Sequence, residues 1–332
     1  MAAREGSFLV QPAAGVTLTR RHAEGVLPFL ERRGGRRPRS NTMNVKFYGT
    51  RGSTPVCEPG FQHFGGNTSC VLIDGPDRVG ILDAGTGIRQ LGKEMLASPE
   101  ERFRRPVFML FSHFHWDHIQ GFPFFAPAYD PTRHFVVTAM GLNRFHCSLR
   151  SVFARQMEDM YFPVPMDQMG ATFTFKQPPD DALGEDDVPE VGTPQPPAPG
   201  HEARVLGVLH NHPGGAYSYR IEGQNGKIVT YCTDIEYADG VIDERIVDLA
   251  RGADLLIHDA QYTPEELEKH RGWGHSSWEQ ACEVAERAGV KLLALTHHDP
   301  AHDDEMLRGM EKACQQRFKD SFFARDQQVV DI

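Results

Sequence analysis

The segment that most constrains the fold of this chain is FSHFHWDHIQGFPFF, which spans residues 111–125. It places His113, His115, Asp117 and His118 within six residues, and aromatic and apolar residues surround them. The run VFMLFS directly before the first histidine is apolar and predicts a core strand. Ionisable groups beside a core strand need specific partners, because an unpaired charge is costly to bury.

The spacing of these four residues suits metal coordination. His113 and His115 are two residues apart, so an extended backbone would point both side chains the same way. Asp117 and His118 follow a turn and could face a second point nearby. Imidazole and carboxylate together suit zinc, iron or manganese better than calcium. The alternative, loop histidines bonded to backbone, explains so dense a pattern poorly.

Two metals need more ligands than these four, and further segments could supply them. The candidates are LHNHPGGAYSYRI (209–221), YCTDIEY (231–237), GHSSWEQA (274–281) and LALTHHDP (293–300). Each lies at the end or start of a predicted strand or helix, where site residues are often found. Two choices stay open on the residues alone, namely His210 or His212 and His297 or His298.

Short apolar runs alternate with helical stretches along the chain, which predicts an α+β fold. Strands are expected at 45–49, 69–74, 79–83, 107–112, 135–139, 172–176, 205–209, 217–222, 228–232, 254–258 and 291–296. Helices are expected at 86–97, 142–160, 243–251, 264–270, 276–288 and 303–317. Two mixed sheets packed face to face with helices on the outer faces, an αββα sandwich, would satisfy this order.

Two segments interrupt this pattern. Residues 1–42 are rich in arginine and glycine. We expect them to be a disordered extension, or to result from a translation start assigned upstream of the true one, since a strand-like run opens at Met43. Residues 177–202 are acidic and rich in proline, so they predict an exposed loop. Residues 43–332 are therefore expected to form one domain with this loop inside it.

The composition favours a soluble cytoplasmic protein without a membrane span. The six cysteines contain no C-x-x-C pair, which argues against disulfides and a cysteine zinc site. The formal charge is −10, and residues 1–42 carry +5 from eight arginines and three glutamates, so the remainder carries −15. An acidic body does not favour general electrostatic binding of a long polyanion, although a local basic patch remains compatible with it.

The motifs together resemble the metallo-β-lactamase fold superfamily, and within it the phosphodiesterase branch that contains ribonuclease Z and the phosphoribosyl cyclic phosphodiesterase. The resemblance runs from residue 43 to about residue 300 and rests on GTRGSTP (49–55), GGNTSCVLI (65–73), ILDAGTG (81–87), SHFHWDHIQG (112–121), HPGGAYSYRI (212–221), TDIEY (233–237), LIHDAQY (256–262) and GHSSWEQA with LLALTHHDP (274–300). The histidine motif is specific for the superfamily, whereas HSSWEQA followed by LTH points to this branch.

The resemblance implies a set of ligands for two divalent ions, with zinc expected first and manganese or iron as alternatives. His113, His115 and His212 would hold one metal, Asp117, His118 and His297 the other, and Asp234 would bridge them. The family pattern favours His212 over His210 and His297 over His298.

Catalysis is assigned by the same resemblance to His275, with Asp259 and the metal ligand Asp117. Asp259 stands where the family usually has glutamate, so its role is an open question. Asp83 and His258 are expected behind the ligands, although Asp83 could equally cap the next helix. The pattern Ser276-x-x-Glu279 predicts a capping box, which would place His275 just before a helix.

The chemistry implied is attack on phosphorus by a hydroxide held between the two metals. A small or cyclic phosphodiester, such as a cyclic nucleotide or cyclic sugar phosphate, is the first expectation, since the chain is acidic. The alternative is a tRNA 3′-processing endonuclease like ribonuclease Z, with RNA as partner. A thioester or lactone hydrolase of the same fold and a non-catalytic binding module fit the histidine motifs less well. Related proteins also suggest a homodimer.

Overall fold

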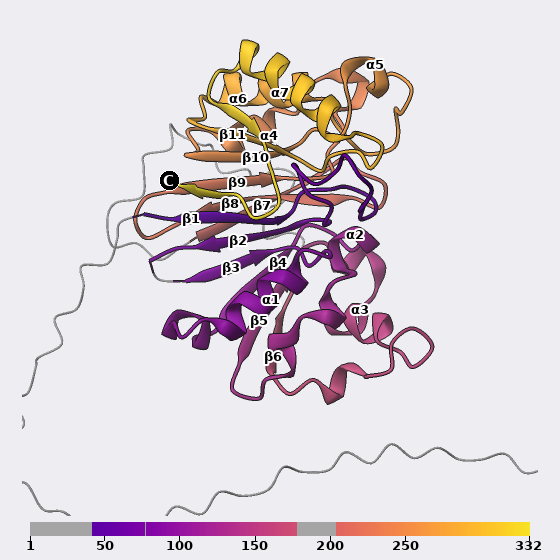
Figure 1. Cartoon of the computed structure of the whole chain (residues 1–332), viewed down its shortest axis with the longest axis vertical. Coiled ribbons are helices and arrows are strands. Elements are labelled where there is room, and N and C mark those ends of the chain that lie inside the picture. Colours follow the sequence, from indigo (N-terminus) through magenta and orange to yellow (C-terminus); the bar gives the residue numbers. More distant parts are fainter. Residues whose placement is uncertain (1–41, 77, 178–203) are drawn as a thin grey trace, which may run out of the picture. The chain divides into compact units, whose positions relative to one another are not determined.

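The structure is a computed structural model that describes residues 42–76, 78–177 and 204–332. Two sheets lie face to face and helices cover their outer faces (Figure 1), which confirms the predicted αββα architecture. The first sheet has the order β13-β1-β2-β3-β4-β5-β6, and the second has the order β12-β11-β10-β9-β8-β7. Two predicted segments lie outside the described residues. They are the extension 1–42, apart from residue 42, and the loop 177–202, apart from residue 177.

The strands of the first sheet are β1 (Asn44–Gly49), β2 (Cys70–Asp74), β3 (Val79–Leu82), β4 (Val107–Phe111), β5 (His134–Ala139), β6 (Thr172–Lys176) and β13 (Val329–Asp331). Those of the second are β7 (Arg204–His210), β8 (Ala216–Glu222), β9 (Ile228–Cys232), β10 (Leu255–Asp259), β11 (Leu293–Thr296) and β12 (Ser321–Phe323). The helices are α1 (Ile88–Ala97), α2 (Trp116–Ile119), α3 (Leu149–Gln156), α4 (Glu244–Ala250), α5 (Pro264–Leu267), α6 (Trp278–Ala288) and α7 (Asp304–Arg317).

Both sheets are mixed in the same way. β13, β1, β2 and β3 pair antiparallel, and β3 to β6 pair parallel. In the second sheet, β7, β8 and β9 pair antiparallel, and β9 to β12 pair parallel. Parallel strands bring their carboxyl ends to one edge of a sheet, so the loops after β4, β9, β10 and β11 can meet there. In Figure 1, α2 and α5, which follow β4 and β10, lie at the same end of the strands.

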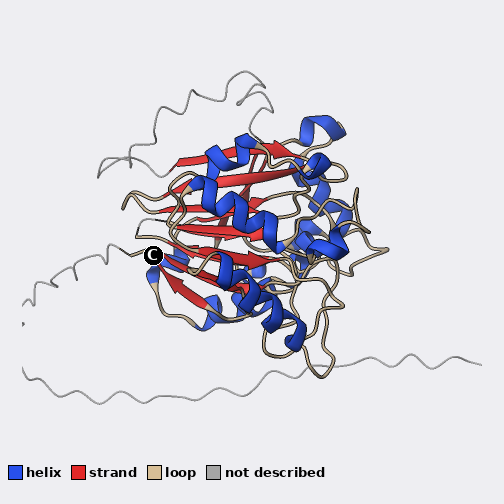
Figure 2. Cartoon of the chain, turned by 90° about the horizontal axis from the view of Figure 1, so that it is seen from above, coloured by secondary structure: helices blue, strands red, loops and turns tan. Residues whose placement is uncertain are grey.

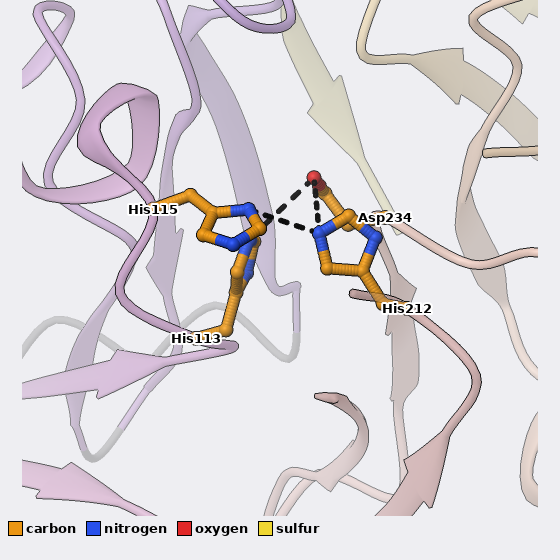
Figure 3. Close-up of side chains that lie close together, drawn as sticks. All are labelled: His113, His115, His212 and Asp234. Atoms are coloured by element: carbon orange, nitrogen blue, oxygen red, sulfur yellow. Dashed lines mark hydrogen bonds and ion pairs between the residues drawn. The ribbon is translucent and has the colours of Figure 1, made fainter. Parts of the chain in front are cut away.

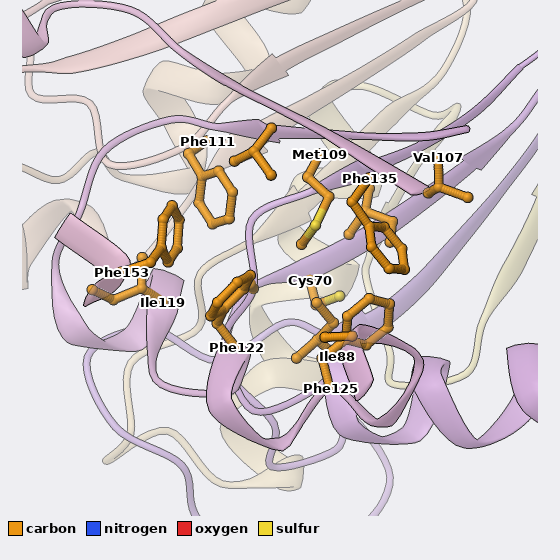
Figure 4. Packing of buried hydrophobic residues seen from close by; sticks show 14 of the residues in the cluster. Cys70, Ile88, Val107, Met109, Phe111, Ile119, Phe122, Phe125, Phe135 and Phe153 are labelled. Atoms are coloured by element: carbon orange, nitrogen blue, oxygen red, sulfur yellow. The ribbon is translucent and has the colours of Figure 1, made fainter. Parts of the chain in front are cut away.

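Three apolar clusters match these layers. One lies between the sheets and includes Val45 and Phe47 from β1 and Leu255 and Ile257 from β10. A second packs the outer face of the first sheet against α1 and α3 (Figure 4). The third lies under α4, α6 and α7 on the second sheet. Figure 2 shows the helices on both sides of the strands. Alternate residues of a strand thus serve different layers, as a period of two requires.

The sequence predicted all eleven strands from β1 to β11, but it missed β12 and β13. Each of these two strands has only three residues, which is too short for an alternating pattern to stand out. The single helix predicted at 142–160 is wrong. His146 adopts a left-handed backbone with φ of 49°, which separates a short 3-10 turn at Leu142–Phe145 from α3. The Ser148 side chain then caps α3 by accepting from the Ser151 backbone.

The helix predicted at 264–270 forms only as the single turn α5, and the helices expected at 86–97, 243–251, 276–288 and 303–317 are present with shorter ends. Within the described part of the chain, no helix is both long and apolar enough to cross a membrane.

Candidate metal centre

The candidate ligands all follow the carboxyl ends of strands. His113 comes two residues after β4, His212 two after β7, Asp234 two after β9 and His297 directly after β11. The short helix α2 then turns the chain so that Asp117 and His118 face back toward the same point. The topology therefore gathers side chains from both sheets at one edge, although their positions in the sequence are far apart.

The first group of donors comprises His113, His115, His212 and Asp234 (Figure 3). Their potential ligand atoms all lie within 4.8 Å of one another. His115 Nδ1 lies 3.0 Å from His212 Nε2. Asp234 Oδ2 lies 3.6 Å from His113 Nε2 and 3.7 Å from His212 Nε2. Three imidazoles and a carboxylate oxygen around one point are a donor set suited to zinc.

The second group comprises Asp117, His118, His297 and again Asp234. His297 Nε2 lies 3.1 Å from Asp117 Oδ2, and it lies 3.3 Å from His118 Nε2. Asp234 presents its other oxygen here, with Oδ1 at 3.1 Å from His118 Nε2 and 3.3 Å from His297 Nε2. Each oxygen of Asp234 thus serves one group, which is the arrangement that a bridging carboxylate needs.

The hydrogen bonds on the far side of the rings support the fit of cations. The Nδ1–H group of His118 donates to Asp83 Oδ2 at 2.8 Å. That of His297 donates to Gln261 Oε1 at 2.9 Å, and that of His212 donates to the Gly274 carbonyl at 2.8 Å. In the neutral rings these bonds leave the lone pairs at Nε2, where they point at one another. His113 Nε2 is buried and has no hydrogen-bond partner among the described residues. Converging lone pairs of this kind are stabilised by cations.

The electrostatics of the site point the same way. Burial lowers the pKa of His297, but the carboxylates of Asp234 and Asp117 outweigh it and raise that pKa to about 9. Burial raises the pKa of Asp234, but His118, His297 and His113 hold it well below its usual range. At His297 the carboxylates therefore outweigh burial, whereas burial lowers the pKa of His113, His115 and His212 in the first group and favours the neutral ring that binds a metal.

Asp83 holds the ring of the candidate ligand His118 in place. Its carboxylate accepts hydrogen bonds from the Ser112 backbone, the Ser112 hydroxyl, His118 Nδ1 and the Tyr231 hydroxyl, all at 2.8 Å. The alternative role as a helix cap is wrong, because α1 has Gly87 at its N-cap and no side-chain cap. Asp83 instead fixes the ring of His118.

His275 lies beside the second group. Its ring stacks on that of His297 with centroids 4.8 Å apart and an interplanar angle of 19°. Its Nδ1 lies 2.8 Å from Asp259 Oδ2, and Asp259 Oδ1 accepts from the Ser276 backbone at 2.8 Å. No described residue hydrogen-bonds to His275 Nε2, so that nitrogen is available for a substrate. The shorter aspartate therefore does reach His275.

A family model described as a beta-lactamase superfamily domain matches residues 80–298, which contain all seven candidate ligands. The chain belongs to the metallo-β-lactamase superfamily. The fold and the family predicted from the sequence are thereby confirmed.

Several characterised proteins are similar to this metallo-β-lactamase superfamily member. Ribonuclease Z from Lactiplantibacillus plantarum is 26% identical over 318 residues, which cover 87% of this chain and 98% of that protein. The structure of human tRNase Z, short form, aligns with a TM-score of 0.59 at 19% identity and covers 86% of this chain and 98% of that one. A diphosphatase from the PhnP family aligns with a TM-score of 0.57 at 16% identity and covers 88% and 97%. These two structures show the shared fold.

The structure separates the pairs of histidines that the residues alone left open. His212 and His297 belong to the donor groups, whereas His210 and His298 belong to none of them. His298 Nε2 instead bonds to the Ala324 carbonyl at 2.8 Å. His258 was expected behind the ligands, but among the described residues it forms no hydrogen bond or ion pair with any of the seven candidates. Its Nδ1 donates to the Asp259 carbonyl and its Nε2 accepts from the Tyr237 hydroxyl, both at 2.7 Å.

The predicted capping box is displaced by one residue. Ser277 and Gln280 form it, rather than Ser276 and Glu279. Ser276 is engaged elsewhere, because its backbone donates to Asp259 and its hydroxyl donates to the Ile235 carbonyl. His275 therefore lies two residues before the N-cap of α6, and Asp259 rather than the helix end fixes its ring.

Sequence reasoning missed several residues that support the site. Gln261 orients His297, and the Ser53 backbone donates to Asp117 Oδ2 at 2.8 Å. Glu236 accepts from the backbones of Gly272 and Gly274 at 2.7 Å each. Glu236 stands two residues after Asp234 in TDIEY, and this position was the only available signal.

Proposed function

We propose that this protein is a metal-dependent phosphodiesterase that cleaves RNA as ribonuclease Z does, with precursor tRNA as its substrate class. The observation that carries the proposal is the pair His275–Asp259 beside a complete seven-residue donor set, in a chain whose similarity to a ribonuclease Z spans nearly that whole protein. This is the alternative reading of the sequence, and the similarity supports it better than the small or cyclic phosphodiester that the acidic composition favoured.

The seven side chains would hold two divalent cations, with Asp234 between them and zinc as the expected metal. The chemistry that such cations would supply there is activation of a water for attack on phosphorus and neutralisation of charge on the phosphate.

The residues of the chain contribute proton transfer and orientation. The Nδ1–H group of His275 donates to Asp259, so the ring presents Nε2 toward the substrate. When Nε2 carries a proton, it can pass that proton to the departing oxygen as the P–O bond breaks, and the Asp259 carboxylate stabilises the imidazolium before transfer. Asp259 is thus a positioning residue, and Asp117 acts as a ligand that the Ser53 backbone orients.

The test uses the full chain after its metal content has been measured. The substrates are a precursor tRNA with a 3′ trailer, 2′,3′-cyclic and 3′,5′-cyclic nucleotides, and bis(p-nitrophenyl) phosphate. We expect cleavage of the precursor at one position near the 3′ end of the mature tRNA. Rapid hydrolysis of a cyclic nucleotide by a protein that leaves the precursor intact would overturn the proposal and favour a small substrate.

A further inference from the structure

Two tryptophans stand at the candidate metal centre with most of their side chains in solvent. Trp116 is 63% exposed and Trp273 is 62% exposed. Trp116 lies between the candidate ligands His115 and Asp117, and Trp273 lies two residues before His275. An exposed tryptophan leaves a large apolar area in water, which is unfavourable in free energy. Two exposed tryptophans near one site therefore indicate a surface that a ligand covers.

The two tryptophans belong to segments that border different sheets. Trp116 begins α2, which follows a strand of the first sheet, whereas Trp273 lies between α5 and α6 of the second. His212 lies between their neighbours, since its Nε2 faces His115 Nδ1 at 3.0 Å and its Nδ1 donates to the Gly274 carbonyl at 2.8 Å. Trp116 and Trp273 are therefore each adjacent in sequence to a residue that the His212 ring contacts, His115 and Gly274.

The backbone around Trp273 is held firmly. The N–H groups of Gly272 and Gly274, its two neighbours, donate to the two oxygens of Glu236 at 2.7 Å each. The Trp273 ring meets His270 edge-on with centroids 4.8 Å apart, and His270 stacks flat on Tyr262 at 4.6 Å. A rigid exposed aromatic loses little conformational entropy when a ligand covers it, which favours a binding role.

The ligand must combine a flat aromatic group with a phosphodiester. The cations that the donor groups near both tryptophans would hold would bind the phosphate, and a nucleobase offers a π face for stacking on an aromatic side chain. The formal charge of −10 gives little general attraction for a polyanion, so base stacking has to supply affinity that basic side chains would otherwise provide.

We propose that Trp116 and Trp273 stack on the nucleobases that flank the phosphate to be cleaved. This inference rests on the proposed phosphodiesterase function and names the part of the substrate that the site recognises. Stacking of one base on an aromatic residue corresponds to about a 10- to 100-fold change in affinity. Two such tryptophans would let the site select a nucleotide chain over a phosphodiester that lacks bases.

The first test compares two chromogenic esters that differ in the base, thymidine 5′-(p-nitrophenyl phosphate) and ethyl p-nitrophenyl phosphate. We expect the ratio of their kcat/KM values to fall about tenfold in Trp116→Ala and in Trp273→Ala. The conservative variants Trp116→Phe and Trp273→Phe keep a ring and should retain most of the ratio. An unchanged ratio in both alanine variants would overturn the proposal.

A second test needs no turnover and uses intrinsic fluorescence. The chain has three tryptophans, and the third, Trp278, packs against the cluster under α6. Titration with AMP should quench wild-type fluorescence, and Trp116→Phe and Trp273→Phe should each remove part of that quenching, whereas Trp278→Phe should not. Quenching that disappears only with Trp278→Phe would contradict the stacking role.

The outcomes separate this inference from the proposed function. The wild type could cleave no precursor tRNA and still prefer the thymidine ester, with that preference lost in the alanine variants. This outcome would support the stacking surface and contradict the proposed RNA substrate. A protein that cleaves the precursor equally well in wild type and both alanine variants retains the proposed function and refutes the stacking surface.

Discussion

His275 and Asp259 form a hydrogen-bonded pair in which Nδ1 lies 2.8 Å from Oδ2, and the pair is packed against a candidate metal ligand through the stacked ring of His297. Asp259 is fully buried and also accepts from the backbones of Asp234, Gln261 and Ser276. The carboxylate therefore ties Asp234, the loop after β10 and the segment before α6 to one point. A displacement of Asp259 would disturb the whole centre.

We predict that His275→Ala retains the metals and lowers kcat by about 100- to 1000-fold, because the role proposed for the ring is to donate a proton and not to coordinate a metal. Metal analysis and steady-state kinetics on the same preparation test this. His275 also forms a third group of possible donors with Asp259 and His297. Loss of metal together with activity would therefore show that His275 is a metal ligand instead.

Asp259→Glu tests whether the aspartate is merely a substitute for the glutamate that the family usually has. The side chain is fully buried and already accepts four hydrogen bonds, so an added methylene has no space. We expect a loss of stability of about 1–3 kcal/mol from overpacking and a lower kcat. Thermal unfolding measures the first and kinetics the second. An Asp259→Glu variant as stable and active as wild type would mean that the site tolerates either length.

Neighbouring histidines provide matched controls for the donor set. His212→Ala and His297→Ala should each reduce the bound metal below two equivalents, because each removes one nitrogen from a group. His210→Ala and His298→Ala remove equally buried rings that belong to neither group, so both should keep the metals. Metal content after dialysis against metal-free buffer decides between the pairs. Equal metal loss in His210→Ala and His212→Ala would contradict the assignment.

Removal of the metals should destabilise the protein. Cations bind only where the ligands have converged, so they stabilise the folded state by about 2.7 kcal/mol when their concentration is 100 times Kd. For a domain of this size that corresponds to about 5 °C in Tm. Differential scanning fluorimetry before and after EDTA, and again after zinc is restored, measures the effect. An identical Tm in all three states would argue against a metal site.

The sequence was sufficient for most strands and for the candidate ligands, for two different reasons. The strands from β1 to β11 contain apolar residues repeated over four to seven positions. This local pattern predicts a strand from the sequence alone. The donors carry unusual chemistry in compact motifs, of which the segment containing His113 and His118 is the densest. Both signals can be read without knowledge of the neighbours in space.

The supporting residues could not be predicted because their roles depend on contacts distant in sequence. Gln261 orients His297 from 36 residues away, and Gly274 accepts from His212 across 62 residues. Glutamine and glycine have no chemistry that marks such roles. The displaced capping box has the same origin, since Ser276 is held by Asp259 and Ile235 from other strands and loops. Tertiary contacts thus overrode the local pattern.

Glu236→Gln should impair catalysis without loss of metal. Both carboxylate oxygens accept backbone N–H groups of the loop that carries His275, whereas an amide offers one acceptor and places a donor against the second N–H. We expect kcat/KM to fall about tenfold. Glu268→Gln is the control, because Glu268 is exposed and its side chain pairs with Arg271 near the same loop. Equal effects in the two variants would contradict the proposed support by Glu236.

Gly274→Ala should displace a candidate ligand. Its backbone has φ of 91°, which L side chains rarely adopt, and a Cβ there would lie 2.1 Å from His212 Nδ1. The ring of His212 would have to move away from the other donors, so we expect both metal content and activity to fall. Gly289→Ala is the matched control, because Gly289 also has a positive φ of 63° but nothing lies within 4 Å of its Cβ position. That variant should lose only about 1 kcal/mol of stability and keep its metals. Normal metal content in Gly274→Ala would show that the close contact with His212 does not hold this ligand in place.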